Sequence, residues 1–173
     1  MDYKDLANLI FPDAKDISYY EEKYPERNLP EGAVVTRFAP SPTGFLHLGG
    51  IMTCLVDSVI SLKTNGIFYL RIEDTDGKRL VENSIETIIK GFQRYNLNIN
   101  EGRISPTEDL GAYGPYMQSE RVEIYQTYAK LLVQKGLAYP CFCTMEDLAK
   151  MREYQEKNKL PIGYYGEFAK CRD

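Results

Sequence analysis

The stretch "RFAPSPTGFLHLGG", residues 37–50, gathers groups that can contact phosphate, and it contains His47, the single histidine of the chain. Gly49 and Gly50 follow this histidine and begin a segment with helical spacing. The free N–H groups at the N-terminus of a helix favour an anion, and glycines let a polyphosphate approach the backbone closely. Thr43 and His47 can each donate a hydrogen bond to a phosphate oxygen. The loop therefore predicts a phosphate site.

A lone histidine has an alternative interpretation, a structural side chain whose hydrogen bonds are satisfied within the fold. We favour the phosphate role because a strand, a proline-stiffened loop, the glycines and a helix N-terminus all converge on His47. The two common phosphate-binding patterns, G-x-x-x-x-G-K-[ST] and G-x-G-x-x-G after a strand, are absent from the sequence. The loop thus lies outside both of those classes.

Four segments around this loop define its frame. Residues 33–38, "AVVTRF", have the β-branched and apolar content of a buried strand, and a second such strand is expected over 67–72. Apolar residues at three- and four-residue spacing predict a helix over about 50–63, which Gly66 is expected to end as its C′ residue. Another helix is expected over about 81–95. Strand, helix and strand at this spacing predict a parallel βαβ unit with a right-handed crossover.

The ends of the two strands carry further polar side chains. Ligands of open parallel sheets bind beyond the carboxyl ends of the strands. Arg37 and Ser41 follow the first strand and Glu73 follows the second, so they are expected at one crevice. The alternative is that Arg37, Glu73, Asp74 and Asp76 form surface ion pairs.

The remaining segments are less informative. Residues 1–32, with three prolines, are interpreted as a surface appendage that begins with a short helix, and residues 96–116 as loop. A helix is expected from Ser119 to just before Gly136, and another after the capping-box pattern of Thr144 and Asp147, through about residue 156.

Composition and charge exclude several classes of protein. The formal net charge is −4, and the first 31 residues hold eight acidic and four basic side chains, so the remainder is neutral and no global positive field exists. No apolar run approaches the roughly 20 residues of a membrane span. The acidic N-terminus lacks the basic region of a signal peptide, so we expect a cytoplasmic protein without a membrane partner.

Three of the four cysteines lie near the end of the chain. Cys141 and Cys143 form a C-x-C pair, and Cys171 follows later. Thiols of a cytosolic chain stay reduced, and soft sulfur ligands suit zinc. The alternative is three unrelated reduced cysteines. Cys54 lies in an apolar helical stretch and is expected in the core.

The loop resembles the first signature of class I aminoacyl-tRNA synthetases, in the form carried by glutamyl-tRNA synthetases. "FYLRIEDTD", residues 68–76, resembles the second conserved block of that group, and residues 114–144 resemble the region that leads into its acceptor-stem domain. The sequence His47-Leu48-Gly49-Gly50 departs from the commoner His-x-Gly-His form, which removes a second imidazole from the phosphates. This departure argues against the smaller adenylyltransferases.

The resemblance implies an α/β fold, a Rossmann-like parallel sheet that forms the first half of a class I catalytic domain, with the start of an inserted acceptor-stem-binding domain. The implied boundaries are an extension over 1–32, the catalytic part over 33–136 and the insertion over 137–173. The lysine-bearing second signature of the family is absent, so we expect an N-terminal fragment of a longer enzyme.

The implied reaction joins L-glutamate to the 3′ end of tRNA(Glu) through a glutamyl-adenylate, with ATP and Mg²⁺, in a monomeric enzyme. The resemblance assigns glutamate binding to Arg37, Ala39, Ser41 and Glu73, with Arg37 on the side-chain carboxylate. The nucleotide and its chemistry are assigned to a second group: Thr43, His47, Gly49 and Gly50. Asp76 is assigned to the 3′ end of the tRNA.

Many members of the resembled family carry Zn²⁺ in the insertion, held by a C-x-C pair, a tyrosine and a later cysteine. Here "GYYGEFAKC" offers Tyr164 or Tyr165, and we take Tyr165 as the fourth ligand beside Cys141, Cys143 and Cys171. Two other functions stay open: a glutamyl-queuosine tRNA(Asp) synthetase paralogue, and a non-enzymatic module that binds tRNA or a partner protein.

Overall fold

A computed structural model describes residues 2–44 and 46–172, so Phe45 of the loop lies outside the described residues. Contacts group the chain into two compact units, residues 15–125 and residues 1–14 with 126–173. This grouping differs from the domain boundaries expected at residues 32 and 136, which stay predictions. In the described part of the chain, no helix has the length and apolar character needed to cross a membrane.

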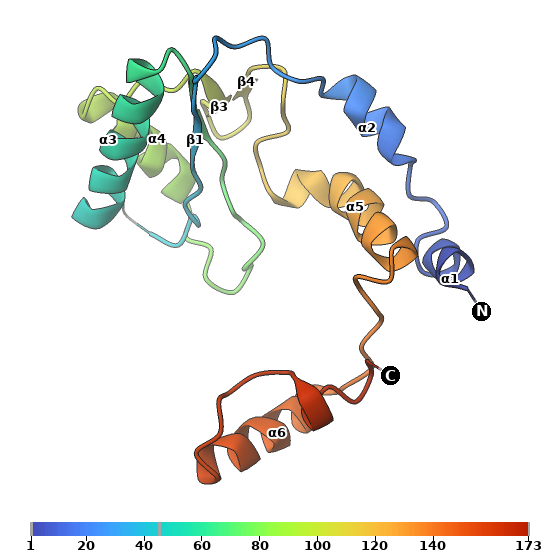
Figure 1. Cartoon of the computed structure of the whole chain (residues 1–173). Coiled ribbons are helices and arrows are strands. Elements are labelled where there is room, and N and C mark those ends of the chain that lie inside the picture. The colour runs from blue at the N-terminus through green and yellow to red at the C-terminus, as the bar shows by residue number, and fades with distance from the viewer. Residues whose placement is uncertain (1, 45, 173) are drawn as a thin grey trace. The chain divides into compact units, whose positions relative to one another are not determined.

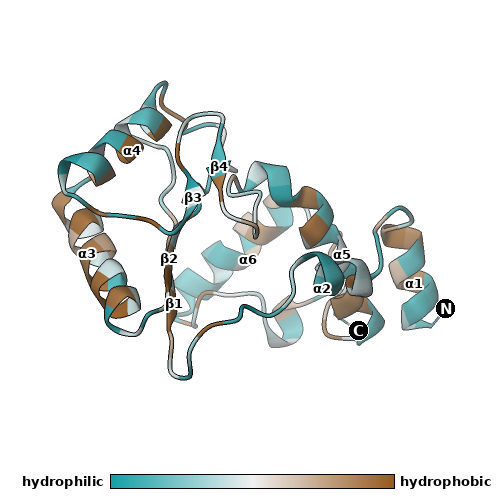
Figure 2. Cartoon of the chain, turned by 90° about the horizontal axis from the view of Figure 1, so that it is seen from above, coloured by the Kyte–Doolittle hydropathy of each residue, from teal (hydrophilic) through white to brown (hydrophobic). Residues whose placement is uncertain are grey.

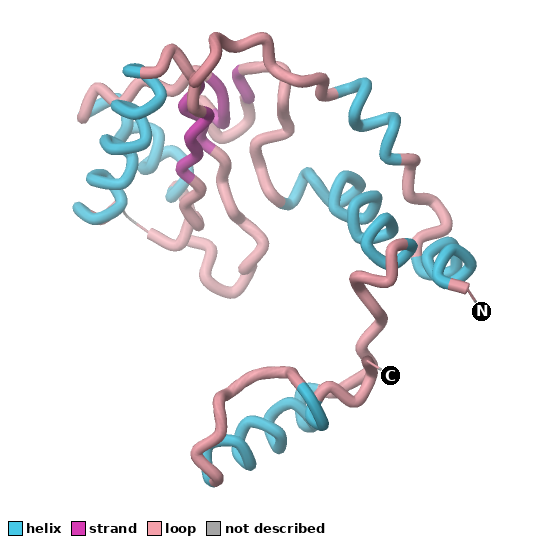
Figure 3. The backbone as a smooth tube through the Cα atoms, viewed as in Figure 1, coloured by secondary structure: helices cyan, strands magenta, loops and turns pink. Residues whose placement is uncertain are grey.

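The larger unit is built on a four-stranded sheet (Figures 1 and 3). Its strands lie in the order β1-β2-β3-β4, with bounds Val35–Phe38, Ile67–Leu70, Glu101–Arg103 and Asp109–Leu110. β1 pairs in parallel with β2 and β2 in parallel with β3, whereas β4 is antiparallel to β3. The parallel βαβ unit and the α/β fold class are therefore confirmed.

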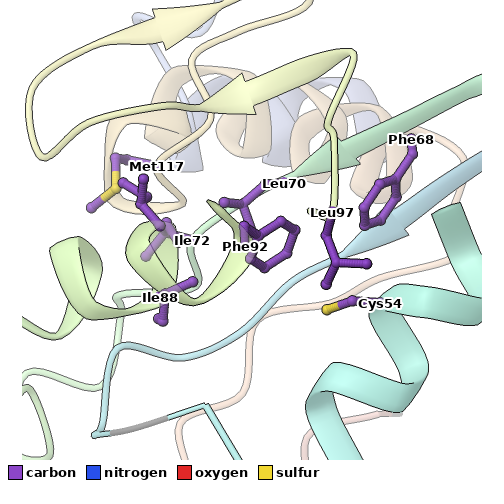
Figure 4. Close-up of a cluster of buried hydrophobic side chains, with 9 residues drawn as sticks. Cys54, Phe68, Leu70, Ile72, Ile88, Phe92, Leu97 and Met117 are labelled. Carbon is purple, nitrogen blue, oxygen red and sulfur yellow. The ribbon is translucent and has the colours of Figure 1, made fainter. Parts of the chain in front are cut away.

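Helices α3 (Leu48–Lys63) and α4 (Ser84–Arg94) accompany this sheet. They contribute Cys54, Ile88 and Phe92 to a core that closes on the side chains of β2, as Figure 4 shows. The buried cluster comprises Cys54, Phe68, Leu70, Ile72, Ile88, Ile89, Phe92, Leu97 and Met117. Burial raises the pKa of the Cys54 thiol to about 12, so Cys54 is the inert core residue that the sequence predicts. Figure 2 shows that α3 is largely hydrophobic.

The expected loop over 96–116 is wrong in part, because it contains the β3–β4 hairpin. Gly102 lies in β3 at φ +133°, and a Cβ there would stand 2.4 Å from the carbonyl oxygen of Leu70. The glycine therefore permits a close approach of β3 to β2. Very short strands that contain glycine give no alternating pattern, which explains why this segment resembles a loop.

The N-terminal segment is not a bare appendage. It forms helices α1 (Tyr3–Ile10) and α2 (Ile17–Lys23), and within the larger unit Tyr24 and Arg27 contact residues 101–114. Residues 119–121 are a 3₁₀ turn that precedes α5 (Val122–Gln134). The capping box of Thr144 and Asp147 is present at the start of α6 (Met145–Lys157), and a 3₁₀ turn follows at Gly166–Phe168.

The turn before β2 corrects the role expected for Gly66. Asn65, at φ +52°, takes the left-handed conformation after α3. A Cβ on Gly66 would stand 2.0 Å from the carbonyl oxygen of Val34, so this glycine allows the chain to pass close to β1.

We expect Gly66→Ala to lower the free energy of unfolding by about 1–3 kcal/mol, because the new methyl group meets backbone that must shift. Gly77→Ala is the matched control, since a Cβ on Gly77 has no heavy atom within 4 Å. Urea unfolding of both variants measures the difference. Equal midpoints for the two variants would contradict the close approach.

Candidate functional site

Two backbone hydrogen bonds hold the loop after β1 against the end of β2. The Arg71 N–H donates to the Phe38 carbonyl at 3.0 Å, and the Glu73 N–H donates to the Pro40 carbonyl at 2.9 Å. Ala39 lies between these two carbonyls. The loop therefore continues the register of the sheet beyond Phe38, which brings the ends of both strands to one place.

The second proline of the loop is anchored from the other side. The carbonyl of Pro42 accepts from the Val81 N–H at 3.0 Å and from the buried Ser84 hydroxyl at 2.9 Å. Ser84 begins α4. The helix that follows the second strand thus fixes the path of the glycine-bearing loop.

A pocket of about 470 Å³ opens inside this loop. It brings together five of the residues that the sequence assigns to the nucleotide and the amino acid: Ser41, Thr43, His47, Gly49 and Gly50. Apolar side chains, including Phe38, Leu46 and Ile88, complete its lining. A pocket of this volume, formed by a loop, a helix N-terminus and an apolar wall, matches a nucleotide site.

His47 is the N-cap of α3, and its Nδ1 accepts a hydrogen bond from the Gly50 N–H at 3.2 Å. In the neutral ring the proton then lies on Nε2, which is left to donate. A Cβ on Gly49 would lie 3.1 Å from the His47 imidazole, so the absence of a side chain at Gly49 leaves room for the ring. The structural and the phosphate interpretations of His47 are therefore compatible, because they use different nitrogens.

Arg37 and Glu73 meet at the strand ends as an ion pair, with 3.3 Å between Nη1 and Oε1. The same Glu73 oxygen lies 3.2 Å from Nη2 of Arg71. Arg71 is the less exposed arginine, with 17% of its side chain accessible against 39% for Arg37. One carboxylate is thus held between an inner and an outer guanidinium.

Arg71 is the site residue that the sequence analysis missed. Residues two apart on an extended strand point to the same face, so the spacing of Arg71 and Glu73 was an available signal. The two acids that follow have local partners instead. Asp74 accepts from the Ser119 N–H and hydroxyl, and Asp76 accepts from Arg79 Nε at 2.6 Å.

The three cysteines of the C-terminal segment form a cluster. The sulfur atoms of Cys141, Cys143 and Cys171 all lie within 4.8 Å of one another, close enough to hold a metal ion. Hydrogen bonds from the Phe142 N–H and from Tyr164 lower the pKa of the Cys171 thiol to about 7. Sulfur donors gathered at this spacing fit zinc.

The tyrosine at this cluster is Tyr164, which corrects the choice of Tyr165. The Tyr164 Oη lies 3.5 Å from Cys141 Sγ and 3.4 Å from Cys143 Sγ. Tyr165 donates its hydroxyl proton to the Pro161 carbonyl at 2.7 Å instead. The Tyr165 hydroxyl is thus engaged away from the thiols, and the Tyr164 hydroxyl lies beside them.

Comparison with known proteins places this geometry in a family. Residues 33–170 match the family model for tRNA synthetases class I (E and Q), catalytic domain, so the chain belongs to that family. The family resemblance inferred from the two signature motifs is confirmed.

The individual relatives compared with this chain are glutamate–tRNA ligases. The chain is 52% identical to a glutamate–tRNA ligase of Clostridium perfringens strain 13 and 51% identical to one of Acetivibrio thermocellus, over its whole length and 32% of theirs. A glutamate tRNA ligase from Elizabethkingia meningosepticum, solved in complex with its amino acid, is 40% identical with a TM-score of 0.69. That match covers 79% of this chain and 26% of the solved chain. The chain thus spans about a third of the length of the curated relatives it matches.

Proposed function

We propose that the full-length protein containing this chain ligates L-glutamate to tRNA(Glu) through a glutamyl-adenylate. The observation that carries the proposal is the position of the Arg37–Glu73 pair at the same strand ends from which the His47 pocket opens. One site is built for a zwitterionic acid and the other for a polyphosphate. The names of the relatives cited above favour this reaction over a tRNA-base-modifying paralogue or a binding module.

The nucleotide would lie with its phosphates against the N-terminus of α3. There the His47 Nε2–H and the Thr43 hydroxyl donate to phosphate oxygens, and Gly49 and Gly50 keep the approach open. Magnesium would enter with ATP and neutralise phosphate charge. The α-carboxylate of glutamate then attacks the α-phosphorus of ATP, and pyrophosphate leaves. No side chain of this chain becomes a covalent nucleophile, so the site works by positioning and by hydrogen bonding to developing charge.

Glutamate would enter by exchange with the existing ion pair. Its side-chain carboxylate replaces Glu73 on the Arg37 fork, and its ammonium takes the Glu73 carboxylate in return. The single contact of 3.3 Å between Arg37 and Glu73 is exposed enough to separate at small cost. Arg71 keeps its own contact with Glu73 during this exchange. Ser41 and the backbone at Ala39 supply further polar contacts, and Asp76 is our candidate for the tRNA 3′ end.

The reaction is tested by glutamate-dependent ATP–pyrophosphate exchange with the full-length protein, with tRNA(Glu) present and absent. Aspartate and glutamine are the matched substrate controls. We expect exchange with glutamate well above both controls, and charging of tRNA(Glu). Exchange that favours glutamine, or none with any of the three, would contradict the proposal.

We further propose that Cys141, Cys143, Cys171 and Tyr164 bind one structural zinc ion. The protein purified without chelator should contain about one equivalent of zinc, because the three sulfur atoms lie within 4.8 Å of one another and zinc prefers such ligands. Tyr164→Phe should weaken zinc binding by roughly tenfold or more, on the scale of losing a supporting ligand contact.

Tyr165→Phe is the matched control, since its hydroxyl contacts the Pro161 carbonyl and not the thiols. It should bind zinc as the wild type does. Chelation should destabilise residues 137–173 and leave the βαβ unit folded. Zinc far below one equivalent, with Cys141, Cys143 and Cys171 all titrating freely, would exclude the site.

A further inference from the structure

Arg27 joins the N-terminal segment to the sheet of the larger unit. Arg27 binds both oxygens of Glu101 on β3: Nη1 meets Oε1, and Nη2 lies 2.7 Å from Oε2. Both side chains are largely buried, with 18% of Arg27 and 12% of Glu101 accessible. A bidentate pair with this little exposure fixes geometry far better than a surface pair.

Aromatic contacts hold Arg27 in this position. Its guanidinium carbon stands 3.7 Å above the centre of the Tyr113 ring, a cation–π geometry. The Tyr113 hydroxyl donates to the Pro25 carbonyl at 2.8 Å, and the Tyr24 hydroxyl donates to the Gly114 carbonyl at 2.5 Å. Residues 24–27 and residues 113–114 are therefore joined from both sides.

Glu101 also binds Tyr116, through the same oxygen, Oε2, that accepts from Arg27 Nη2. The hydroxyl of Tyr116, a residue with only 2% of its surface exposed, donates to Glu101 Oε2 at 2.6 Å. Burial alone would raise the pKa of Glu101, but the hydrogen bonds from Arg27 and Tyr116 lower it, so the carboxylate stays charged. One carboxylate thus connects the N-terminal segment to Tyr116.

Residues 116–119 run beside residues 72–75 and are joined to them by five hydrogen bonds. The Ile72 N–H donates to the Tyr116 carbonyl at 2.9 Å, and the Gln118 N–H donates to the Ile72 carbonyl at 2.8 Å. Asp74 accepts two hydrogen bonds from Ser119, and the Thr75 hydroxyl donates to the Gln118 side chain. Glu73 lies within the segment held in this way.

We propose that Arg27 is a positioning residue for Glu73, acting through Glu101, Tyr116 and the backbone pairing of residues 116–119 with 72–75. The inference rests on the proposed function and extends it, because it gives the N-terminal segment a part in glutamate binding. Arg27 touches no substrate. It holds the strand end that presents the Glu73 carboxylate to the ammonium.

The test is Arg27→Met in the full-length protein, which keeps an unbranched side chain similar to the arginine stem and removes the charged fork. We expect the KM for glutamate to rise roughly tenfold, on the scale of mutations that act through intervening contacts, and the KM for ATP to stay within about twofold. Amide hydrogen exchange at residues 72–75 should become faster. Arg27→Lys keeps the charge but not the fork, so its KM for glutamate should fall between those of the wild type and Arg27→Met.

Arg94→Met is the matched control, because Arg94 is an exposed arginine in the last turn of α4, away from this network. Arg94→Met should leave the KM for glutamate, the KM for ATP and the rate of amide hydrogen exchange at residues 72–75 unchanged. A wild-type KM for glutamate in Arg27→Met would overturn the proposal, and so would an equal rise of both KM values. If the wild type lacks glutamate-dependent ATP–pyrophosphate exchange, the proposed function fails, and amide hydrogen exchange alone decides the inference. Unchanged amide exchange rates at residues 72–75 in Arg27→Met would then overturn the inference, and faster rates would support it.

Discussion

Replacing His47 by alanine should lower the rate of glutamate activation by about 10²-fold or more, the scale of one lost transition-state hydrogen-bond donor. The Nε2–H is the donor at issue, because Nδ1 is already occupied by the Gly50 N–H. Affinity for ATP should change far less, since the backbone N–H groups of α3 still face the phosphates. ATP–pyrophosphate exchange by the full-length protein, with tRNA present, measures the rate.

His47→Ala also removes a helix cap, which costs about 0.5–2 kcal/mol of stability. His47→Ser separates the two effects. Serine restores a capping oxygen for the first turn of α3, but it cannot reach the position of Nε2. We expect the serine variant to regain the stability of the wild type and to stay as inactive as the alanine variant. Recovery of activity in His47→Ser would show that the histidine acts only as a cap.

The sequence was most informative where one physical signal decided the outcome. The apolar strands and the helical spacing over 50–63 correspond to β1, β2 and α3, and the capping box of Thr144 and Asp147 is formed as its spacing predicts. The loop expected to bind phosphate lines a pocket, and a single sequence could indicate it because its residues are contiguous. Such signals are local, so a single sequence carries them.

The features that the sequence did not reveal depend on contacts between distant residues. Arg27 and Glu101 are 74 positions apart, and neither stands in a motif. The hairpin of β3 and β4 is defined by backbone pairing, and strands of two and three residues are too short to show an alternating sequence pattern. The choice between Tyr164 and Tyr165 depends on which hydroxyl lies beside the thiols, and only the positions of Cys141 and Cys171 decide it.

Arg37 gives the second large effect. Arg37→Lys should lower kcat/KM for glutamate by roughly ten- to a hundredfold, because hydrogen bonds to charged groups contribute about 1.5–3 kcal/mol each and each 1.4 kcal/mol is tenfold. A point ammonium keeps the charge opposite Glu73, but it cannot offer two parallel N–H donors to a substrate carboxylate. KM for ATP should not change.

The fold should tolerate Arg37→Lys, because the Arg37–Glu73 pair is partly exposed and a lysine can still pair with the same carboxylate. Arg94→Lys is the matched control for the loss of a guanidinium elsewhere on the surface, and it should behave as the wild type. Glutamate titrations at saturating ATP, followed by pyrophosphate exchange, give the comparison. If Arg37→Lys keeps the glutamate dependence of the wild type, Arg37 does not bind the substrate carboxylate, and the ion pair with Glu73 is only a surface contact.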